Sequence, residues 1–261
     1  MKDQQPNFDL KEAVRAYWSA RAATFDDSPS HYIEPRYGRP EWQAFIKQAA
    51  GLSQDETMTG FHVLDLACGT GEISRVLLSL GAEVVGVDFS EAMLAKSSAK
   101  LAKLNWKPRL CDAEMLSGIS TESVNFIVTR HLVWTLTDPA NAFSQWYRTL
   151  KPGGRLLIND GNWSKPFSVG YRIRRTIAHW LKPLPKRSSE DFETDSYIRQ
   201  NLPYKDGLCK QKLTSELEMV GFTLLKELDP SPLYRQAMRA WPLADRLRQT
   251  SENRFALVFE K

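Results

Sequence analysis

The chain has 261 residues, of which 42% are hydrophobic and 25% charged, and its formal net charge is +4. A chain of this length can bury enough apolar surface to fold without disulfides or metal, and three cysteines without paired spacing indicate neither a disulfide framework nor a zinc site. No apolar run reaches the roughly 20 residues that cross a bilayer, and the first residues lack the apolar stretch of a secretory signal. We therefore expect a soluble, cytoplasmic protein without a membrane span.

Residues 1–60 lie outside the predicted sheet. An amphipathic helix is predicted at 10–23, a turn-rich stretch at 26–40 and a second helix at 41–51. Within the first helix, Tyr17 and Arg21 are four residues apart and so share one face.

From residue 61 onward, apolar segments rich in Val, Ile and Leu alternate with segments of helical period. This alternation is typical of a parallel sheet covered by helices on both faces. Strands are predicted at 62–67, 83–88, 108–112, 124–129, 155–160, 223–228 and 254–260. Helices are predicted at 71–80, 90–103, 139–150 and 212–220, and the last strand is expected to be an antiparallel hairpin partner at the edge.

An insertion at 161–211 interrupts the sheet after its fifth strand, at a position where long insertions are usually functional. Apolar and basic residues alternate at helical spacing over 169–181, which predicts an amphipathic helix. We expect the insertion to be a lid with one helix face over a ligand pocket. A solvated basic face is the alternative, and a membrane-surface helix is a third reading that needs more apolar bulk or a second anchor. The basic residues are Lys165, Arg172, Arg174, Arg175, Lys182, Lys186 and Arg187.

A glycine-containing turn follows the first predicted strand. Gly69 and Gly71 stand between that strand and a helix, where a ligand lying against the backbone needs residues without side chains and gains the N–H groups of the helix start. Asp88 ends the next strand roughly 20 residues later, where its carboxylate can accept hydrogen bonds from two ribose hydroxyls. The spacing favours a nucleoside ligand over a tight turn with no ligand.

Two residues narrow the choice of nucleoside. Ser74 stands where a dinucleotide-binding loop has its third glycine or alanine, so an oxidoreductase is the weaker reading. Asp65 lies inside the strand before the loop, where a carboxylate repels a pyrophosphate and attracts an ammonium group. A buried acid that only ties the loop together is the alternative for Asp65.

Five ordered motifs at 63–72, 84–90, 111–114, 124–129 and 150–154 resemble those of the class I S-adenosylmethionine-dependent methyltransferases, of the small-molecule type. The resemblance covers roughly residues 61–160. It implies an α/β, Rossmann-like sheet of seven mostly parallel strands in the order 3-2-1-4-5-7-6, with the last strand antiparallel. It also implies S-adenosyl-L-methionine as cofactor and S-adenosyl-L-homocysteine as product.

The resemblance further assigns contacts to the cofactor. The methionine part would meet the loop residues Ala67, Gly69, Thr70 and Gly71, with Thr129, Arg130 and Leu132 bordering it through backbone atoms, and the charge of Asp65 would place it beside the same part. Asp88 would hold the ribose. The adenine would pack on Phe89 and Met93, with Asp112 and Ala113 at its edge. Small-molecule members of the family close an aromatic and a basic residue of the first helix over the cofactor, positions that Tyr17 and Arg21 match.

The acceptor is expected beyond the carboxyl ends of strands four and five, because ligands bind there in open parallel sheets. His131 has a suitable intrinsic pKa for a general base, and Asp160 is the alternative base. A structural histidine at the cofactor rim is the competing reading for His131. Trp134 and Trp163 are the expected aromatic walls, although tryptophans at such positions also serve packing alone.

We therefore predict in-line transfer of a methyl group to a small molecule. The expected organisation is an N-terminal segment over the cofactor (1–60), a binding core (61–160), a lid (161–211) and the remaining sheet (212–261). RNA methylation and a non-catalytic cofactor-binding module are the alternatives. Nucleic acid is the less favoured partner because no RNA-binding domain is appended, and no metal is expected because no acid follows strand four directly. The sequence defines neither the acceptor atom nor the oligomeric state.

Overall fold

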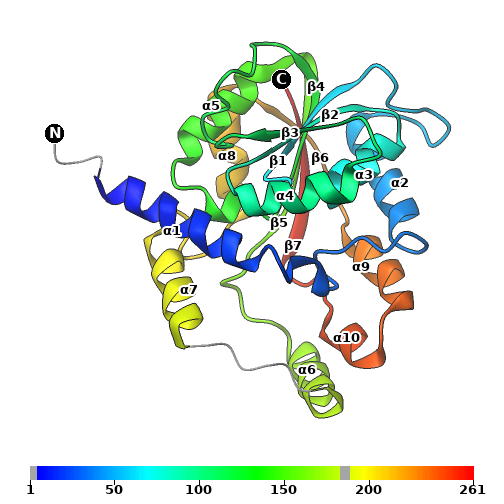
Figure 1. Cartoon of the computed structure of the whole chain (residues 1–261), viewed down its shortest axis with the longest axis vertical. Helices are drawn as coiled ribbons and strands as arrows, with labels where there is room; N and C mark the ends of the chain where they lie inside the picture. Colours follow the sequence, from blue (N-terminus) through cyan, green and yellow to red (C-terminus); the bar gives the residue numbers. More distant parts are fainter. Residues whose placement is uncertain (1–4, 183–188) are drawn as a thin grey trace.

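The computed structural model describes residues 5–182 and 189–261 and contains a seven-stranded sheet in the order β3-β2-β1-β4-β5-β7-β6 (Figure 1). Strand β7 pairs antiparallel with both of its neighbours, and the other pairs are parallel. The predicted fold class and strand order are confirmed. The strands are β1 (His62–Leu66), β2 (Glu83–Asp88), β3 (Trp106–Leu110), β4 (Val124–Arg130), β5 (Leu150–Gly161), β6 (Thr223–Leu228) and β7 (Arg254–Glu260).

Helices cover both faces of the sheet. On one face pack α2 (Arg39–Ala50), α3 (Glu72–Ser79) and α9 (Ser231–Ala237), and on the other α5 (Pro139–Thr149) and α8 (Lys210–Val220). Helix α4 (Glu91–Leu101) runs beside β2 and β3. The central strands are therefore buried from both sides, which is why they read as apolar runs without alternation.

Most helices and strands that the sequence predicted begin and end within a few residues of their predicted bounds, because local capping and turn residues define these ends. The Ser90 hydroxyl accepts from the Met93 amide at 3.2 Å and begins α4. At β3 the predicted bounds were wrong: the strand spans 106–110, and it is followed by a turn in which the amides of Met115 and Leu116 donate to the Asp112 carbonyl. Strand β5 also begins earlier than predicted, at Leu150, which pairs with Val124 before a register shift.

Two helices far apart in the sequence lie side by side. Helix α1 (Gln5–Arg21) packs against α7 (Ser189–Asn201), a helix of the insertion that the sequence did not predict, through Val14 and its neighbour Leu10 on one side and Ile198 and Leu202 on the other. The N-terminal segment and part of the insertion thus form one cover over the carboxyl ends of the strands.

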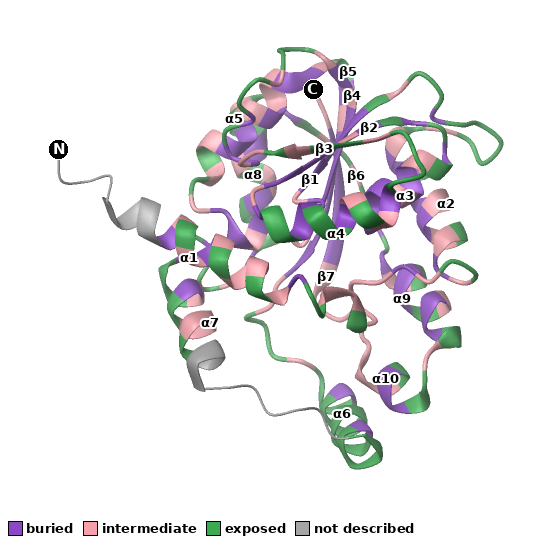
Figure 2. Ribbon diagram, viewed as in Figure 1, coloured by how far each residue is buried: buried purple, intermediate pink, exposed green. Residues whose placement is uncertain are grey.

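Helix α6 (Val169–Leu181) has the predicted bounds but projects from the body of the molecule (Figure 1). It packs against α10 (Leu243–Arg248), another unpredicted helix, through Tyr171 and Ala178. Its exposed side is visible in Figure 2. Lys186 and Arg187 of the basic stretch lie outside the described residues. No helix in the described ranges is long and apolar enough to cross a membrane.

Candidate active site

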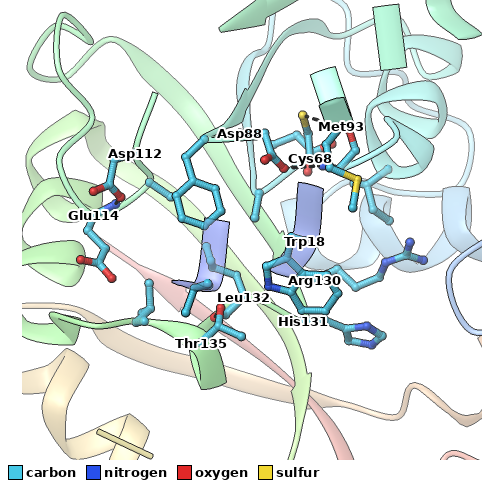
Figure 3. A pocket seen from close by; sticks show the side chains of 18 of the residues that line it. Trp18, Cys68, Asp88, Met93, Asp112, Glu114, Arg130, His131, Leu132 and Thr135 are labelled. Atoms are coloured by element: carbon cyan, nitrogen blue, oxygen red, sulfur yellow. Dashed lines mark hydrogen bonds between the residues drawn. The ribbon is translucent and has the colours of Figure 1, made fainter. Parts of the chain in front are cut away.

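An inner cavity opens at the carboxyl ends of β1, β2 and β4, where ligands bind in sheets of this kind. Its empty volume is about 990 Å³, with the open space at its mouth included. Figure 3 shows the side chains around it. The predicted residues that line it are Asp65, Ala67, Gly69, Asp88, Phe89, Met93, Asp112, Ala113, Arg130, His131 and Leu132.

Other lining residues were not predicted. Most come from α1, from the segment between α1 and α2, and from the turns after β3 and β4, and their participation depends on tertiary packing, whereas Cys68 and Ile73 belong to the glycine loop and to α3. They are Lys11, Val14, Trp18, Phe25, His31, Cys68, Ile73, Glu114, Thr135, Leu136 and Thr137.

Asp88 stands at the centre of the cavity wall. Its two carboxylate oxygens accept from the amides of Gly69 at 2.8 Å and Ser90 at 2.9 Å, which fixes the carboxylate beside the glycine loop. Burial raises the Asp88 pKa to about 6 despite these hydrogen bonds. The carboxylate keeps lone pairs for further donors, as a ribose diol requires.

The two glycines of the loop have different surroundings. Gly69 has φ of +53°, and a Cβ added to it would meet only the Phe25 ring, at 3.8 Å. Gly71 has φ of +83°, and a Cβ there would lie 2.9 Å from the Leu101 side chain in α4. Gly69 thus leaves room on the cavity side, whereas Gly71 allows α4 to approach the loop and does not line the cavity.

Thr70 also turns away from the cavity, contrary to its predicted position. Its hydroxyl donates to Asp26 Oδ1 at 2.6 Å, and Asp26 is ion-paired with Lys100 at 2.7 Å. These contacts tie the segment between α1 and α2 to the loop, so Thr70 acts on the site through the cover. Thr129 is buried in β4 and is not among the residues that line the cavity, and its expected contact through backbone atoms stays a prediction.

Asp65 is fully buried and accepts from the Ser74 hydroxyl at 2.5 Å. Burial raises its pKa to about 7, while the hydrogen bond from Ser74 and the charge of Arg130 oppose that shift. Asp65 is therefore consistent with both roles considered from the sequence, a structural tie of the loop and a carboxylate beside the ligand. Its carboxylate ties α3 to the strand, and it also borders the cavity.

The first helix covers the cavity with a different face from the one predicted. Lys11, Val14 and Trp18 line the cavity, whereas Tyr17 and Arg21 do not. The Tyr17 hydroxyl donates to Asp195 of α7 at 2.8 Å, and the Arg21 guanidinium stacks over the Tyr17 ring. The expected pair is turned toward α7 because that helix takes up the neighbouring face of α1.

Lys11 holds the opposite end of the cavity. Its ammonium group lies 2.7 Å from Asp112 and 2.6 Å from Glu114, in the segment after β3. Burial would lower the Lys11 pKa, but the hydrogen bonds to the two carboxylates outweigh it and raise the pKa. Lys11 therefore stays charged and links α1 to the predicted adenine end of the site.

An outer chamber adjoins the inner cavity and shares Trp18, His31 and His131 with it. Both predicted tryptophans, Trp134 and Trp163, line this chamber. The other lining residues are Ser30, Ser164, Phe167, Asp195, Arg199, Leu202, Tyr204, Lys205, Gly207, Leu208 and Arg254. Helix α6 lines neither space, so the expectation that its apolar face covers the pocket was wrong, and α7 occupies that place.

His131 lies where the two spaces meet, but its contacts do not suit a general base. Its Nε2 accepts from Arg254 Nη1 at 2.6 Å, since a guanidinium has no acceptor, and Nδ1 must then carry the proton. Burial and the charges of Arg254, Arg130 and His31 lower the His131 pKa well below its usual value. His131 is therefore a neutral hydrogen-bond donor, with a strained φ of +62°.

Asp160 does not reach either space. It is fully buried and accepts from the amides of Val133 at 2.9 Å and Gly161 at 2.8 Å, and burial raises its pKa to about 7. It lines neither the cavity nor the chamber, so the predicted alternative base was wrong. Its place is structural: it fixes the turn that carries His131 and Trp134.

Within residues 5–182 and 189–261, no three His, Cys, Asp or Glu side chains are arranged to hold a metal ion. The metal-free site stays a prediction. Arg254 and Arg130 contribute positive charge near the junction, and no carboxylate in the described part of the chain is ion-paired with either. The junction thus has cationic and neutral donors, and His131 is not free to act as a base.

The chain is similar to known proteins in sequence and in fold. A family model described as a methyltransferase domain matches residues 64–158. A ubiquinone biosynthesis O-methyltransferase of Coxiella burnetii is 34% identical over 113 residues, which are 42% of this chain and 48% of that protein. The match thus spans about half the length of that relative. A protein of the same name from Pseudomonas fluorescens is 28% identical over 184 residues, 70% of this chain and 72% of that protein.

Among solved structures, the phosphoethanolamine N-methyltransferase 2 of Haemonchus contortus, in complex with S-adenosyl-L-methionine, superposes with a TM-score of 0.61 at 18% identity. The superposition covers 93% of this chain and 57% of that one. At this level of identity the likeness concerns the fold.

Proposed function

We propose that this chain, which belongs to the class I S-adenosylmethionine-dependent methyltransferases, transfers a methyl group to a small-molecule acceptor. The observation that carries the proposal is the junction of two spaces at Trp18, His31 and His131. In-line displacement needs the donor and the nucleophile on opposite sides of one carbon. An inner cavity for the cofactor and an outer chamber for the acceptor meet that need.

The cofactor fits the inner cavity by the chemistry of its walls. Asp88 would accept from the ribose hydroxyls, Phe89 and Met93 would pack on the adenine, and Gly69 leaves room beside the loop. Asp65 and Arg130 offer opposite charges to an amino acid group. When bound there, S-adenosyl-L-methionine supplies a methyl carbon on a positively charged sulfur. The chain itself binds, orients and excludes water.

For the acceptor we propose an aromatic ring carrying a hydroxyl group. Trp134, Trp163 and Phe167 provide flat walls in the outer chamber, and curated relatives are named O-methyltransferases. The Arg254 guanidinium, which also lines the chamber, would stabilise an oxyanion there and so lower the pKa of a nearby hydroxyl. The hydroxyl would then react as an oxyanion and release its proton to water, and His131 does not act as the base.

The protein incubated with a metabolite extract and methyl-labelled S-adenosyl-L-methionine, followed by mass spectrometry, tests the proposal. We expect a labelled aromatic ether, and loss of that product with Trp163→Ala, because Trp163 lines the outer chamber and not the inner cavity. Label in RNA instead of a small molecule would overturn the acceptor class. Cofactor binding in calorimetry without any labelled product would support the non-catalytic module.

A further inference from the structure

Five large apolar side chains of α6 are directed to solvent. Val169, Ile173 and Ile177 are 69%, 57% and 47% exposed, and Trp180 and Leu181 near the end of the helix are 83% and 56% exposed. Soluble proteins seldom expose so many large apolar side chains together, and such clusters mark contact surfaces.

The exposed side chains form one stripe along the helix. With about 100° of rotation per residue, the five positions fall within an arc of about 120°. Tyr171 and Ala178 lie on the opposite side and are buried against α10, where the Tyr171 hydroxyl and the Arg248 side chain donate to backbone carbonyls across the helix pair. Helix α6 is thus held firmly by one face, and the described residues leave the other uncovered.

Basic residues border the stripe on both sides. Arg172 and Arg174 fall at its two edges by the same rotation, and no acidic residue occurs between positions 165 and 182. Glu252 and Asp245, which belong to the adjoining C-terminal segment, pair with Arg174 and Lys182. No carboxylate in the described part of the chain pairs with Arg172 or Arg175. The helix therefore offers an apolar stripe inside a positively charged frame.

We propose that α6 docks the protein on an anionic lipid bilayer, with the apolar stripe in the interface and the arginines at the head groups. Helices of this composition bind in the plane of such surfaces. The Trp180 ring suits the boundary between head groups and acyl chains. A second copy of the chain is the poorer partner, because pairing two α6 stripes would bring like charges together.

Docking would also orient the site. Phe167 lines the outer chamber and contacts the Tyr171 ring, with centroids 4.8 Å apart, and Ser168 caps α6 directly after it. A bilayer under α6 therefore lies next to one wall of the chamber. This consequence rests on the proposed function and fits an acceptor that partitions into lipid, whereas the docking itself does not depend on methyl transfer.

Co-sedimentation of the full chain with vesicles tests docking. Vesicles of phosphatidylcholine with 30% phosphatidylglycerol should retain the protein at least tenfold more strongly than phosphatidylcholine alone, and 1 M NaCl should release most of it. The double variant Ile173→Glu/Ile177→Glu should lose at least tenfold in vesicle binding. Met219→Glu, which changes a side chain of α8 that is 80% exposed, is the matched control and should bind as the unaltered chain does.

Binding of S-adenosyl-L-homocysteine, measured separately, should be unchanged in both variants because α6 lines neither space. This keeps a failure of docking distinct from a failure of the proposed function. Equal vesicle binding by the Ile173→Glu/Ile177→Glu variant and the control, or no binding to either vesicle, would overturn the proposal. A dimer in lipid-free solution that the double variant dissociates would overturn it in favour of a second copy.

Discussion

Arg254 and His131 share a hydrogen bond of 2.6 Å between Nη1 and Nε2, at the point where the inner cavity meets the outer chamber. The Arg254 guanidinium lies between the rings of Trp163 and Tyr234, and Tyr234 also accepts from Nη1 at 3.1 Å. Because the hydrogen bond from Arg254 occupies the Nε2 lone pair, His131 cannot act as the general base that the sequence predicted. The Arg254 guanidinium instead places a fixed positive charge at this point. The chemistry then depends on stabilising the acceptor's negative charge.

The first prediction concerns this pair. Arg254→Met should lower methyl transfer about 100-fold, equivalent to about 2.7 kcal/mol, because the cation at the nucleophile is lost. Binding of S-adenosyl-L-homocysteine should change less than about threefold, and NMR titration should show a higher His131 pKa, since the Arg254 charge helps to lower it. Arg254→Lys, which keeps the charge but not the planar fork, should lie between. Unchanged turnover in Arg254→Met would show that Arg254 does not stabilise the negative charge of the acceptor.

A second prediction tests the cofactor site. Asp88→Ala should abolish detectable binding of S-adenosyl-L-methionine in calorimetry, because the variant loses the carboxylate beside the glycine loop. Circular dichroism should retain the helix and strand content, since Asp88 is the last residue of β2 and its side chain lines the cavity. Glu91→Ala, at an exposed position of the following helix, is the control and should bind normally. Full affinity in Asp88→Ala would contradict the assignment.

Affinity for S-adenosyl-L-homocysteine should depend on pH. Ligand hydroxyls donate to ionised Asp88, and its pKa is about 6, so affinity should fall as pH drops through 6, by up to about tenfold per unit. Asp65, with a pKa of about 7, should add a loss that begins nearer neutrality. Calorimetry from pH 8 to 5 measures these losses of affinity. The Asp65→Asn variant should lack the loss near neutrality, and the Asp88→Asn variant should lack the loss near pH 6. A flat profile in the unaltered chain would refute this.

The two loop glycines should fail differently. Gly69→Ala should weaken cofactor binding more than it lowers the melting temperature, because its Cβ enters the cavity side of the loop. Gly71→Ala should mainly destabilise the fold, by about 1–3 kcal/mol, because the new Cβ collides with α4 at a left-handed position. Thermal melting beside calorimetry separates the two effects. The same ratio of effects in both variants would show that they share one role.

Asp160 should prove structural. Asp160→Ala leaves the buried amides of Val133 and Gly161 without their acceptor, at a cost of about 1–3 kcal/mol for each unsatisfied group. The melting temperature should fall by about 2–4 °C for each kcal/mol. Asp160→Asn keeps one acceptor oxygen and should fall less. Turnover lost in Asp160→Ala without any change in melting would instead favour catalysis.

Much of the fold could be predicted because its signals are local. Buried parallel strands read as apolar runs, Ser90 caps its helix, and the acid that ends β2 stands at a fixed spacing from the glycine loop. The cavity residues on these strand ends were predicted for the same reason. Short helices such as α9 and α10 were missed because their packing partners, α2 and α6, are distant in the sequence.

Strand and turn patterns in the sequence were enough to predict the strands and to place Asp65 and Asp88 beside the glycine loop, because these patterns are local. The order of the strands was predicted from the resemblance to a known family. Three features became clear only from the tertiary structure. One is the face of α1 that covers the cavity. The others are the hydrogen bond from Arg254 of the last strand to Nε2 of His131 and the hydrogen bond from a backbone amide after β4 to Asp160. Each of these contacts joins residues that are far apart in the sequence. The helical or strand period of a segment does not predict such long-range contacts.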